Sequence, residues 1–302
     1  MRKKSKIIII LTILVTSSIY LVLITGCNRQ QSANPVIGTV LSEDGIPISY
    51  QVRGIGKPAL VFVHGWCCDK SYWDSQVKFF ARNYTVVTVD LPGHGDSGMG
   101  RKEWTIPAYG KDIAVVEKKL GLNQVILVGH SIGGSVILEA ARRMPDTIIG
   151  IIGVDTFHNV ELKYTPEFTD TYLAPFYDDF AEATANMVRN MFIPSTDSVL
   201  VEKIVIDMSS APPEVGIGEL IGNGNYHNDE LLQTFREAQV PIRCINSDKV
   251  PTDVETIRKY ALSFEVKYMP DVGHFVMMED PETFNRLLEE TVQKLIDLNA
   301  AK

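Results

Sequence analysis

The chain has 302 residues, of which 45% are hydrophobic and 22% are charged, and its formal net charge is −8. These fractions are typical of a globular protein and exclude a disordered, collagenous or coiled-coil chain, while four cysteines are too few for a disulfide framework. The acidic balance argues against a nucleic-acid-binding protein, which needs clustered Lys and Arg. The length fits two domains, or one large α/β domain with an insertion.

The N-terminus has the parts of a secretory leader. Basic residues among the first six are followed by uncharged, mostly apolar residues 7–24, and the sequence Ile-Thr-Gly-Cys then ends at Cys27. This ending resembles the lipobox of bacterial lipoproteins, in which the thiol is lipidated and the chain is cut before it. We therefore predict a signal peptide at 1–26, a tether at 27–35, and a body outside the cytoplasm held to a membrane of the cell envelope by its lipid. An uncleaved transmembrane anchor is the alternative, because about 18 apolar residues can just span a bilayer.

The body begins with a predicted hairpin and continues as alternating strands and helices. Residues 36–41 and 46–52 flank the turn Glu43-Asp44-Gly45, as in a hairpin. Short apolar runs typical of strands buried on both faces of a parallel sheet follow at 59–63, 85–89, 125–128 and 148–154. Helical patterns separate them at 71–81, 107–120 and 133–144. The alternation predicts a wound α/β sheet.

Residues 157–239 do not continue this alternation. They are rich in aromatic residues and show only helical patterns, at about 178–192, 197–208, 213–221 and 229–237. We interpret this segment as a helical cap inserted into a core of residues 36–156 and 240–302. The last part of that core has predicted strands at 242–245 and 264–268 and predicted helices at 253–260 and 281–298.

One motif carries the chemistry. Gly129-His130-Ser131-Ile132-Gly133 matches G-x-S-x-G, with an apolar strand before it and a helical pattern after it. This is the setting of a nucleophile elbow, a sharp turn that exposes a serine hydroxyl at the N-terminus of a helix. We predict that Ser131 is a catalytic nucleophile.

An activated serine needs a base and donors for the oxyanion. Of the six histidines, His274 follows the last predicted strand, and its loop emerges on the same sheet edge as the elbow; we predict that it is the base. The amides of Ile132, directly after the nucleophile, and of Trp66, after strand 59–63, are the predicted oxyanion donors. Cys67 and Cys68 come next and either line the pocket or, as the simpler interpretation has it, only pack.

Two aspartates compete for the acid that orients His274. Asp248 follows strand 242–245 and lies between Ser131 and His274 in the chain, in the order Ser…Asp…His. Asp155 ends strand 148–154, one strand beyond the nucleophile. We favour Asp248, because chain order and loop position agree, and keep Asp155 as the alternative.

Four stretches together resemble the α/β-hydrolase family of the AB hydrolase-1 type: VFVHGW, DLPGHGDSG, VGHSIGG and DVGHFVMME, beginning at positions 61, 90, 128 and 271. The resemblance implies a mostly parallel central sheet with helices on both faces, a helical cap after the sixth strand, and a serine-acid-histidine triad. A serine at the elbow departs from the haloalkane dehalogenases and epoxide hydrolases, which use a carboxylate. The family usually carries its acid in the loop of Asp248, within a Gly-x-x-Asp pattern that is missing here, and some members carry it at the position of Asp155.

The segment from Gly93 to Gly98 formally matches the dinucleotide-binding pattern G-x-G-x-x-G. Such a site needs a helix to begin there, whereas the following residues continue as a predicted loop. No cofactor and no metal site are predicted.

The predicted function is that of a membrane-tethered serine hydrolase that cleaves small-molecule esters or related acyl compounds through an acyl-enzyme. Carbon–carbon bond hydrolases, lactonases, peptidases and cofactor-free haloperoxidases use the same triad on this fold and remain alternatives. A binding or signalling lipoprotein without turnover is the alternative from another class.

Overall fold

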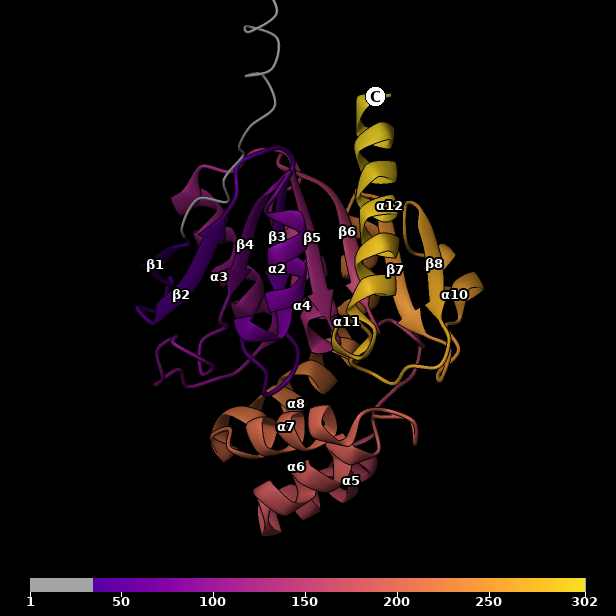
Figure 1. Cartoon of the computed structure of the whole chain (residues 1–302). Helices are drawn as coiled ribbons and strands as arrows, with labels where there is room; N and C mark the ends of the chain where they lie inside the picture. The colour runs from indigo at the N-terminus through magenta and orange to yellow at the C-terminus, as the bar shows by residue number, and fades with distance from the viewer. Residues whose placement is uncertain (1–34, 302) are drawn as a thin grey trace, which may run out of the picture. The chain divides into compact units, whose positions relative to one another are not determined.

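The computed structural model describes residues 35–301. Their strands form one eight-stranded sheet in the order β1-β2-β4-β3-β5-β6-β7-β8 (Figure 1). The hairpin strands β1 (Val36–Leu41) and β2 (Pro47–Arg53) pair antiparallel, and β2 is also antiparallel to β4. The remaining pairs are parallel and join β3 (Ala59–Val63), β4 (Thr85–Val89), β5 (Val125–His130), β6 (Ile148–Val154), β7 (Ile242–Ser247) and β8 (Phe264–Met269).

Helices cover both faces of the sheet, which is why the central strands consist of continuous apolar runs. Every residue of β3 and β5 is buried. Helices α2 and α12 cover one face, and α3 and α4 cover the other. The core elements outside the sheet are η1 (Lys70–Trp73), α2 (Asp74–Phe80), α3 (Ile106–Leu120), α4 (Ile132–Arg143), α10 (Val254–Arg258), α11 (Val276–Glu279) and α12 (Pro281–Ala300). The predicted fold class is confirmed.

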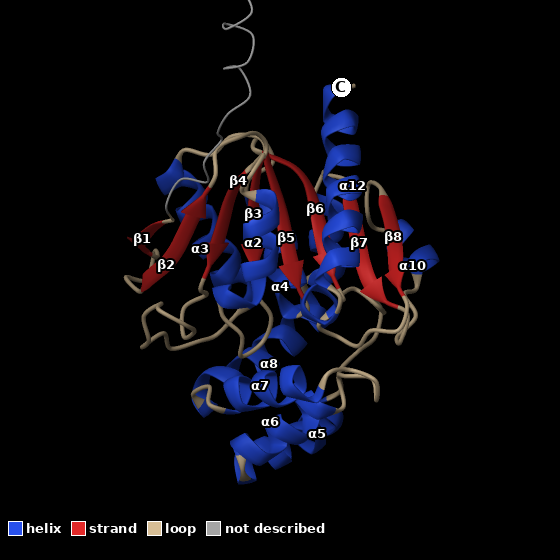
Figure 2. Ribbon diagram, in the orientation of Figure 1, coloured by secondary structure: helices blue, strands red, loops and turns tan. Residues whose placement is uncertain are grey.

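The segment between β6 and β7 is helical, as predicted. It contains α5 (Pro166–Asp178), α6 (Phe180–Arg189), α7 (Ser198–Ser209), α8 (Pro213–Asp229) and α9 (Leu231–Glu237). Helices α5 to α8 form a cap beyond the carboxyl ends of the parallel strands (Figure 2), whereas α9 packs on α4. The cap therefore lies over the sheet edge at which the predicted catalytic residues emerge.

Three cap helices differ from the sequence-based expectation. Helix α5 was not predicted; it begins with Pro166 at its first position, and the hydroxyl of Thr165 accepts a hydrogen bond from the amide of Phe168. Asp179, in extended conformation, ends α5 and caps α6, so the helix expected at 178–192 is shorter. Helix α8 continues to Asp229, beyond the expected end at residue 221.

Two glycines of α8 lie where the helix packs directly against the core. A Cβ added to Gly218 would lie 2.4 Å from a ring carbon of Trp104, and one added to Gly222 would lie 2.1 Å from the carbonyl oxygen of Trp104. Glycine at these positions lets the helix approach a core loop closely. Tertiary packing thus outweighs the low helix propensity of glycine.

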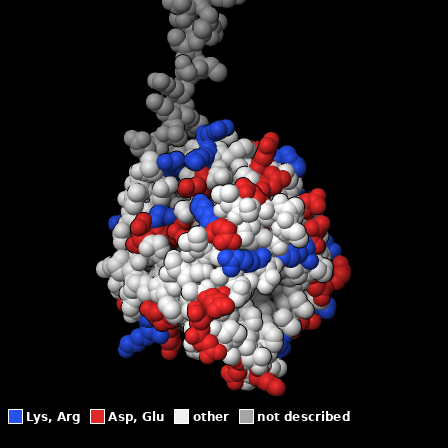
Figure 3. All heavy atoms as spheres, turned by 60° about the horizontal axis from the view of Figure 1, so that its bottom comes forward, with Lys and Arg blue, Asp and Glu red and all other residues white. Residues whose placement is uncertain are grey.

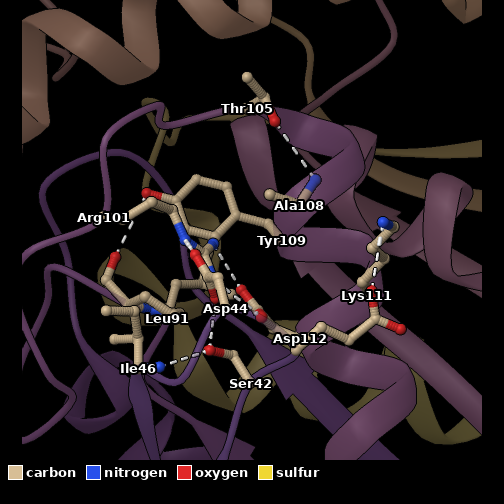
Figure 4. Close-up of polar contacts among 12 residues, drawn as sticks. Ser42, Asp44, Ile46, Leu91, Arg101, Thr105, Ala108, Tyr109, Lys111 and Asp112 are labelled. Carbon is tan, nitrogen blue, oxygen red and sulfur yellow. Dashed lines mark hydrogen bonds and ion pairs between the residues drawn. The ribbon is translucent and has the colours of Figure 1, made fainter.

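The loop that carries Trp104 is held by a buried arginine (Figure 4). The guanidinium of Arg101 donates hydrogen bonds to both carboxylate oxygens of Asp112 in α3, at 2.7 and 3.0 Å. It also donates two bonds of 2.9 Å to Asp44 in the β1–β2 turn. These pairs connect the hairpin, the loop and α3, and so fix the surface on which α8 packs.

Within residues 35–301, no helix has both the length and the apolar character needed to cross a bilayer. The predicted signal peptide at 1–26 and the predicted lipidation site Cys27 lie outside the described residues.

Candidate active site

Ser131 occupies a strained turn between β5 and α4. Its backbone has φ 53° and ψ −121°, a conformation that is uncommon for residues other than glycine and is frequent at functional sites. The Ser131 amide donates to the carbonyl of Val154 at 2.9 Å. A Cβ added to Gly129 would lie 2.3 Å from the carbonyl oxygen of Gly133, so the turn is too tight for side chains there. This is the geometry of a nucleophile elbow.

His274 and Asp155 meet at the same sheet edge. The Nδ1 atom of His274 lies 2.6 Å from Oδ2 of Asp155. The other carboxylate oxygen of Asp155 accepts a hydrogen bond from the amide of Ser247 at 2.8 Å and lies 3.6 Å from Nε2 of His158. Burial by itself would raise the pKa of Asp155, but the hydrogen bond and charge of His274 outweigh it, so the pKa lies below its ordinary value. Asp155 is therefore a carboxylate at neutral pH.

The structure brings the alternative acid, Asp155, rather than the favoured Asp248, against His274. Strand β7 runs to Ser247, two residues further than predicted. The amide of Asp248 continues the ladder by donating to the carbonyl of Met269, and its side chain is exposed. Its carboxylate bonds to none of the residues in 35–301. The preference for Asp248 is therefore replaced by Asp155, whose backbone turns with φ 46° at the end of β6.

The predicted oxyanion residues lie beside the nucleophile. Ile132 is the first residue of α4, and the amide at this position has no acceptor within the helix. A Cβ added to Gly65 would lie 3.2 Å from Cβ of Ser131, so the loop leading to Trp66 runs along the elbow. The ring of His274 lies 4.6 Å from that of His130, the residue before the nucleophile, so nucleophile, base and both predicted donors gather at one place from elements distant in sequence.

The two histidines nearest the elbow do not compete with His274 as base. Burial lowers the pKa of His64 to about 4 and that of His130 to about 3, so both rings are too weakly basic to take the serine proton efficiently at neutral pH. His130 has a structural contact instead, since its Nε2 donates to the carbonyl of His274 at 3.0 Å.

Glu279 holds the loop of His274, a role that the sequence did not indicate. Its carboxylate accepts hydrogen bonds from the amides of Gly273, at 2.9 Å, and Phe275, at 3.1 Å. These are the residues on either side of His274. The hydroxyl of Thr196, from the cap, also donates to Glu279 at 2.6 Å. The position of His274 is therefore fixed jointly by α11 and the cap.

Trp66 connects the oxyanion loop to the cap. Its indole Nε1 donates to the carbonyl of Gly216 in α8 at 2.7 Å. Cys67 and Cys68, next in the chain, are buried, and burial raises the pKa of both thiols well above its ordinary value. They are therefore uncharged packing residues at neutral pH.

A second link between core and cap is a buried contact between a histidine and a glutamate. Nε2 of His94 lies 3.2 Å from Oε2 of Glu219 in α8. Burial by itself would lower the pKa of His94, but the Glu219 carboxylate raises it above its ordinary value. His94 belongs to the segment that resembles a dinucleotide motif, which is a loop closed by a hydrogen bond from the Gly93 amide to Gly98. The predicted loop is confirmed, since the next helix begins only at Ile106.

Among residues 35–301, no three His, Cys, Asp or Glu side chains are grouped as a metal site requires.

Known proteins share both the sequence pattern and the fold. Residues 60–287 match the model of the alpha/beta hydrolase family. A dihydrolipoyllysine-residue acetyltransferase component of an acetoin cleaving system, from Cupriavidus necator, is 26% identical over 82% of this chain and 67% of that protein. A non-heme haloperoxidase from Rhodococcus erythropolis is 38% identical over 34% of this chain and 38% of its own length. A bifunctional esterase/perhydrolase from Acinetobacter calcoaceticus is 34% identical over 36% of this chain and 41% of its own length.

Solved structures of similar fold include several esterases. A thermophilic esterase from Thermogutta terrifontis superposes with a TM-score of 0.74 at 23% identity, covering 87% of this chain and 99% of that one. A membrane phospholipase A superposes with a TM-score of 0.71 at 19% identity, covering 95% of this chain and 97% of that one. At such identities the likeness concerns the fold. Together with the family match over most of the chain, it shows that this protein is a member of the alpha/beta hydrolase family.

Proposed function

We propose that this hydrolase cleaves esters or related acyl compounds with Ser131 as nucleophile, His274 as base and Asp155 as the acid. The observation that carries the proposal is the 2.6 Å contact between His274 and Asp155, at the sheet edge to which the strained elbow brings Ser131. A carboxylate on Nδ1 leaves Nε2 of the imidazole as the atom that takes a proton from the nucleophile.

In the proposed reaction, the hydroxyl oxygen of Ser131 attacks the substrate carbonyl while His274 takes its proton. Asp155 holds the ring and stabilises the imidazolium, and the amides of Trp66 and Ile132 donate to the oxyanion. Each such donor contributes about 3–4 kcal/mol of transition-state stabilisation. His274 then protonates the leaving group, and a water molecule activated by the same histidine releases the acyl group.

Other reactions of the same triad are the nearest alternatives. The resemblance to a haloperoxidase and to an esterase/perhydrolase keeps cofactor-free peroxide chemistry among them, since a peroxide can replace water in the second step. Lactone opening, peptide cleavage and carbon–carbon bond hydrolysis would use the same residues. A binding protein without turnover would not need a strained serine and a carboxylate-paired histidine at one edge.

A fluorophosphonate probe tests the nucleophile directly. Wild type should be labelled on Ser131 and the Ser131→Ala variant should not. Chromogenic esters of graded acyl length, and the same assay with hydrogen peroxide in place of water as acceptor, then separate esterase from perhydrolase activity. A wild-type protein that is folded yet unlabelled would support the binding protein instead.

The proposed location is outside the cytoplasm, on a membrane of the cell envelope, with Cys27 lipidated. Its support is the N-terminal pattern of a basic start, an apolar stretch and a lipobox-like ending. The mass of the mature protein tests it: wild type should begin at a lipid-modified Cys27, and Cys27→Ser should abolish the modification. An intact N-terminal segment in the wild-type protein would support the transmembrane anchor instead.

A further inference from the structure

The cap contains a hollow of about 280 Å³ between α5 and α8. Its walls are mainly aromatic and aliphatic, from Tyr164, Phe168, Tyr172, Leu173, Leu220 and Gly224. The volume lies just below the range for pockets that hold drug-sized molecules, about 300–1,000 Å³. The hollow therefore has room for one small ligand.

The aromatic wall belongs to a regular series of rings. Tyr164, Phe168, Tyr172, Phe176 and Phe180 recur every four residues, and neighbouring ring centroids lie between 5.7 and 6.1 Å apart. The middle three of these residues lie in α5, where a spacing of four places side chains on one face of the helix. The series ends at Trp66, whose ring lies 5.9 Å from Phe176 and 6.0 Å from Phe180.

Within α5, exposure falls along the rings from Phe168 to Phe176. Phe168 is 50% exposed and Tyr172 is 40% exposed, whereas Phe176 is 5% exposed. The inner rings are thus part of the packing around Trp66, while the outer rings are available to a ligand. Figure 3, which turns the cap end toward the viewer, shows charged groups scattered between stretches of uncharged surface.

The lining selects an uncharged ligand. Its polar groups are the side chains of Thr169 and Asn223 and the hydroxyls of two tyrosines, and none of the eight lining residues is charged. The hollow between α7 and the core differs, because Lys203 and Asp207 line it. A charged ligand would lose hydration in the α5–α8 hollow without gaining a partner.

The lining also favours a flat ring over a flexible chain. The rings of Phe168 and Tyr172 are nearly parallel, at an interplanar angle of 9°, and present faces on which another ring can stack. The mouth is braced, since the Asn228 side chain accepts a hydrogen bond from the Tyr164 amide at 2.9 Å and donates one to the Tyr164 carbonyl at 2.7 Å. A preformed site of this kind loses little entropy on binding.

We propose that the hollow between α5 and α8 binds an uncharged aromatic small molecule, at a site on the cap distinct from the serine pocket. This inference goes beyond the proposed ester cleavage and does not depend on it. Its ligand contacts come from α5 and α8, the latter being the helix whose Gly216 carbonyl holds Trp66.

The test uses 2-naphthol as a fluorescent probe, uncharged at pH 7, titrated into the full chain. Gly224 provides the blocking variant, because a Cβ added there meets no atom within 4 Å. Gly224→Leu should fill the hollow without a clash, retain the folded state and weaken binding about tenfold or more. Gly224→Ala, which adds a single methyl group, is the matched control and should bind nearly as wild type does.

Protein variants and ligand analogues test whether binding of the probe is specific to this hollow. Phe168→Ala should weaken binding, whereas Val199→Ala, which removes a still more exposed apolar side chain from α7, should not. The charged analogue 2-naphthoate and the saturated, non-planar decahydro-2-naphthol should both bind at least about tenfold more weakly than 2-naphthol.

Blocking Ser131 separates this proposal from the proposed function. Protein labelled with the fluorophosphonate, or the Ser131→Ala variant, should bind 2-naphthol as the unlabelled wild type does. Loss of binding on blocking Ser131, or equal binding by Gly224→Leu and wild type, would place the probe in the serine pocket and overturn the inference. Absence of saturable binding to wild type would overturn it as well, whatever the result of the labelling.

Discussion

Asp155 and His274 are 119 positions apart in the chain, yet Oδ2 of one lies 2.6 Å from Nδ1 of the other. Strand β6 places Asp155 and the loop after β8 places His274, with β7 between these two strands in the sheet. The amide of Ser247, the last residue of β7, donates a hydrogen bond to the other carboxylate oxygen of Asp155. One carboxylate thus faces both the imidazole and the intervening strand, so its orientation is fixed from two sides.

The acid can be identified by two separate substitutions. Asp155→Asn should lower kcat by up to about 10⁴-fold, the scale on which a triad histidine held in the wrong tautomer loses activity. Asp248→Asn should stay within a few-fold of wild type, because its side chain is exposed and forms no hydrogen bond or ion pair with the described residues. Hydrolysis of a chromogenic ester measures both. A large loss in Asp248→Asn with little change in Asp155→Asn would show that Asp248, in the loop after β7, is the acid.

Ser131→Ala should abolish turnover while leaving the protein folded. Loss of the nucleophile in a serine hydrolase costs about 10⁶ in kcat. The side chain is only partly buried, and such substitutions usually change the free energy of unfolding by about 0.5 kcal/mol or less. Activity and urea unfolding should be measured on the same preparation. Retained hydrolysis would show that another residue is the nucleophile.

Glu279→Gln should lower kcat more than it raises KM. The amide that replaces one carboxylate oxygen cannot accept a hydrogen bond, so one of the amides beside His274 loses its acceptor and the loop shifts. Displacement of a catalytic group by about 1 Å can cost about 10²-fold in rate. Glu282→Gln, an exposed change in the first turn of α12, is the control. An equal loss in both variants would contradict a specific role for Glu279.

The pair of His94 and Glu219 should make stability depend on pH. The pKa of His94 is raised in the folded state, so the folded protein binds this proton more tightly than the unfolded chain. The resulting stabilisation is fully present below the unfolded pKa, about 6.5 for histidine, and is lost as pH rises through the folded pKa. The free energy of unfolding, wild type minus the double variant His94→Gln/Glu219→Gln, should therefore fall as the pH rises above about 6.5. A difference that stays constant over this range would show that the pair does not titrate there.

The sheet could be predicted from the sequence almost residue by residue. Strands β3, β4 and β6 begin and end where the apolar runs do. They are buried on both faces, so each one leaves an uninterrupted apolar signal. Ser131 and His274 were predictable for a related reason, since the elbow requires particular residues at fixed spacing and the histidine loop follows the last strand.

The acid could not be chosen from the sequence. Asp155 and Asp248 both follow strands that end at the same edge, and chain order favoured Asp248. The deciding facts are that β7 extends to Ser247 and that Asp155 turns with a positive φ. Both depend on the pairing of strands and on the packing around the site, which a single sequence does not display.

The cap was predicted less completely than the core. Helix α5 contains Pro175 and aromatic residues that contribute little helix propensity. Helix α8 contains glycines whose purpose is close packing against Trp104. The role of Glu279 could not be predicted from the sequence, because its main partners are backbone amides, which every residue except proline has.

The bond between Trp66 and Gly216 bears on how such enzymes can be re-engineered. Trp66 contributes its backbone to the proposed oxyanion site and its side chain to the cap. A foreign cap grafted between β6 and β7 would therefore have to present a carbonyl at the place of Gly216 and leave room for the indole. Exchanging the cap would therefore also alter the support of the loop that carries the proposed oxyanion donor. Grafts should be screened first for reaction rate and only afterwards for preference among substrates.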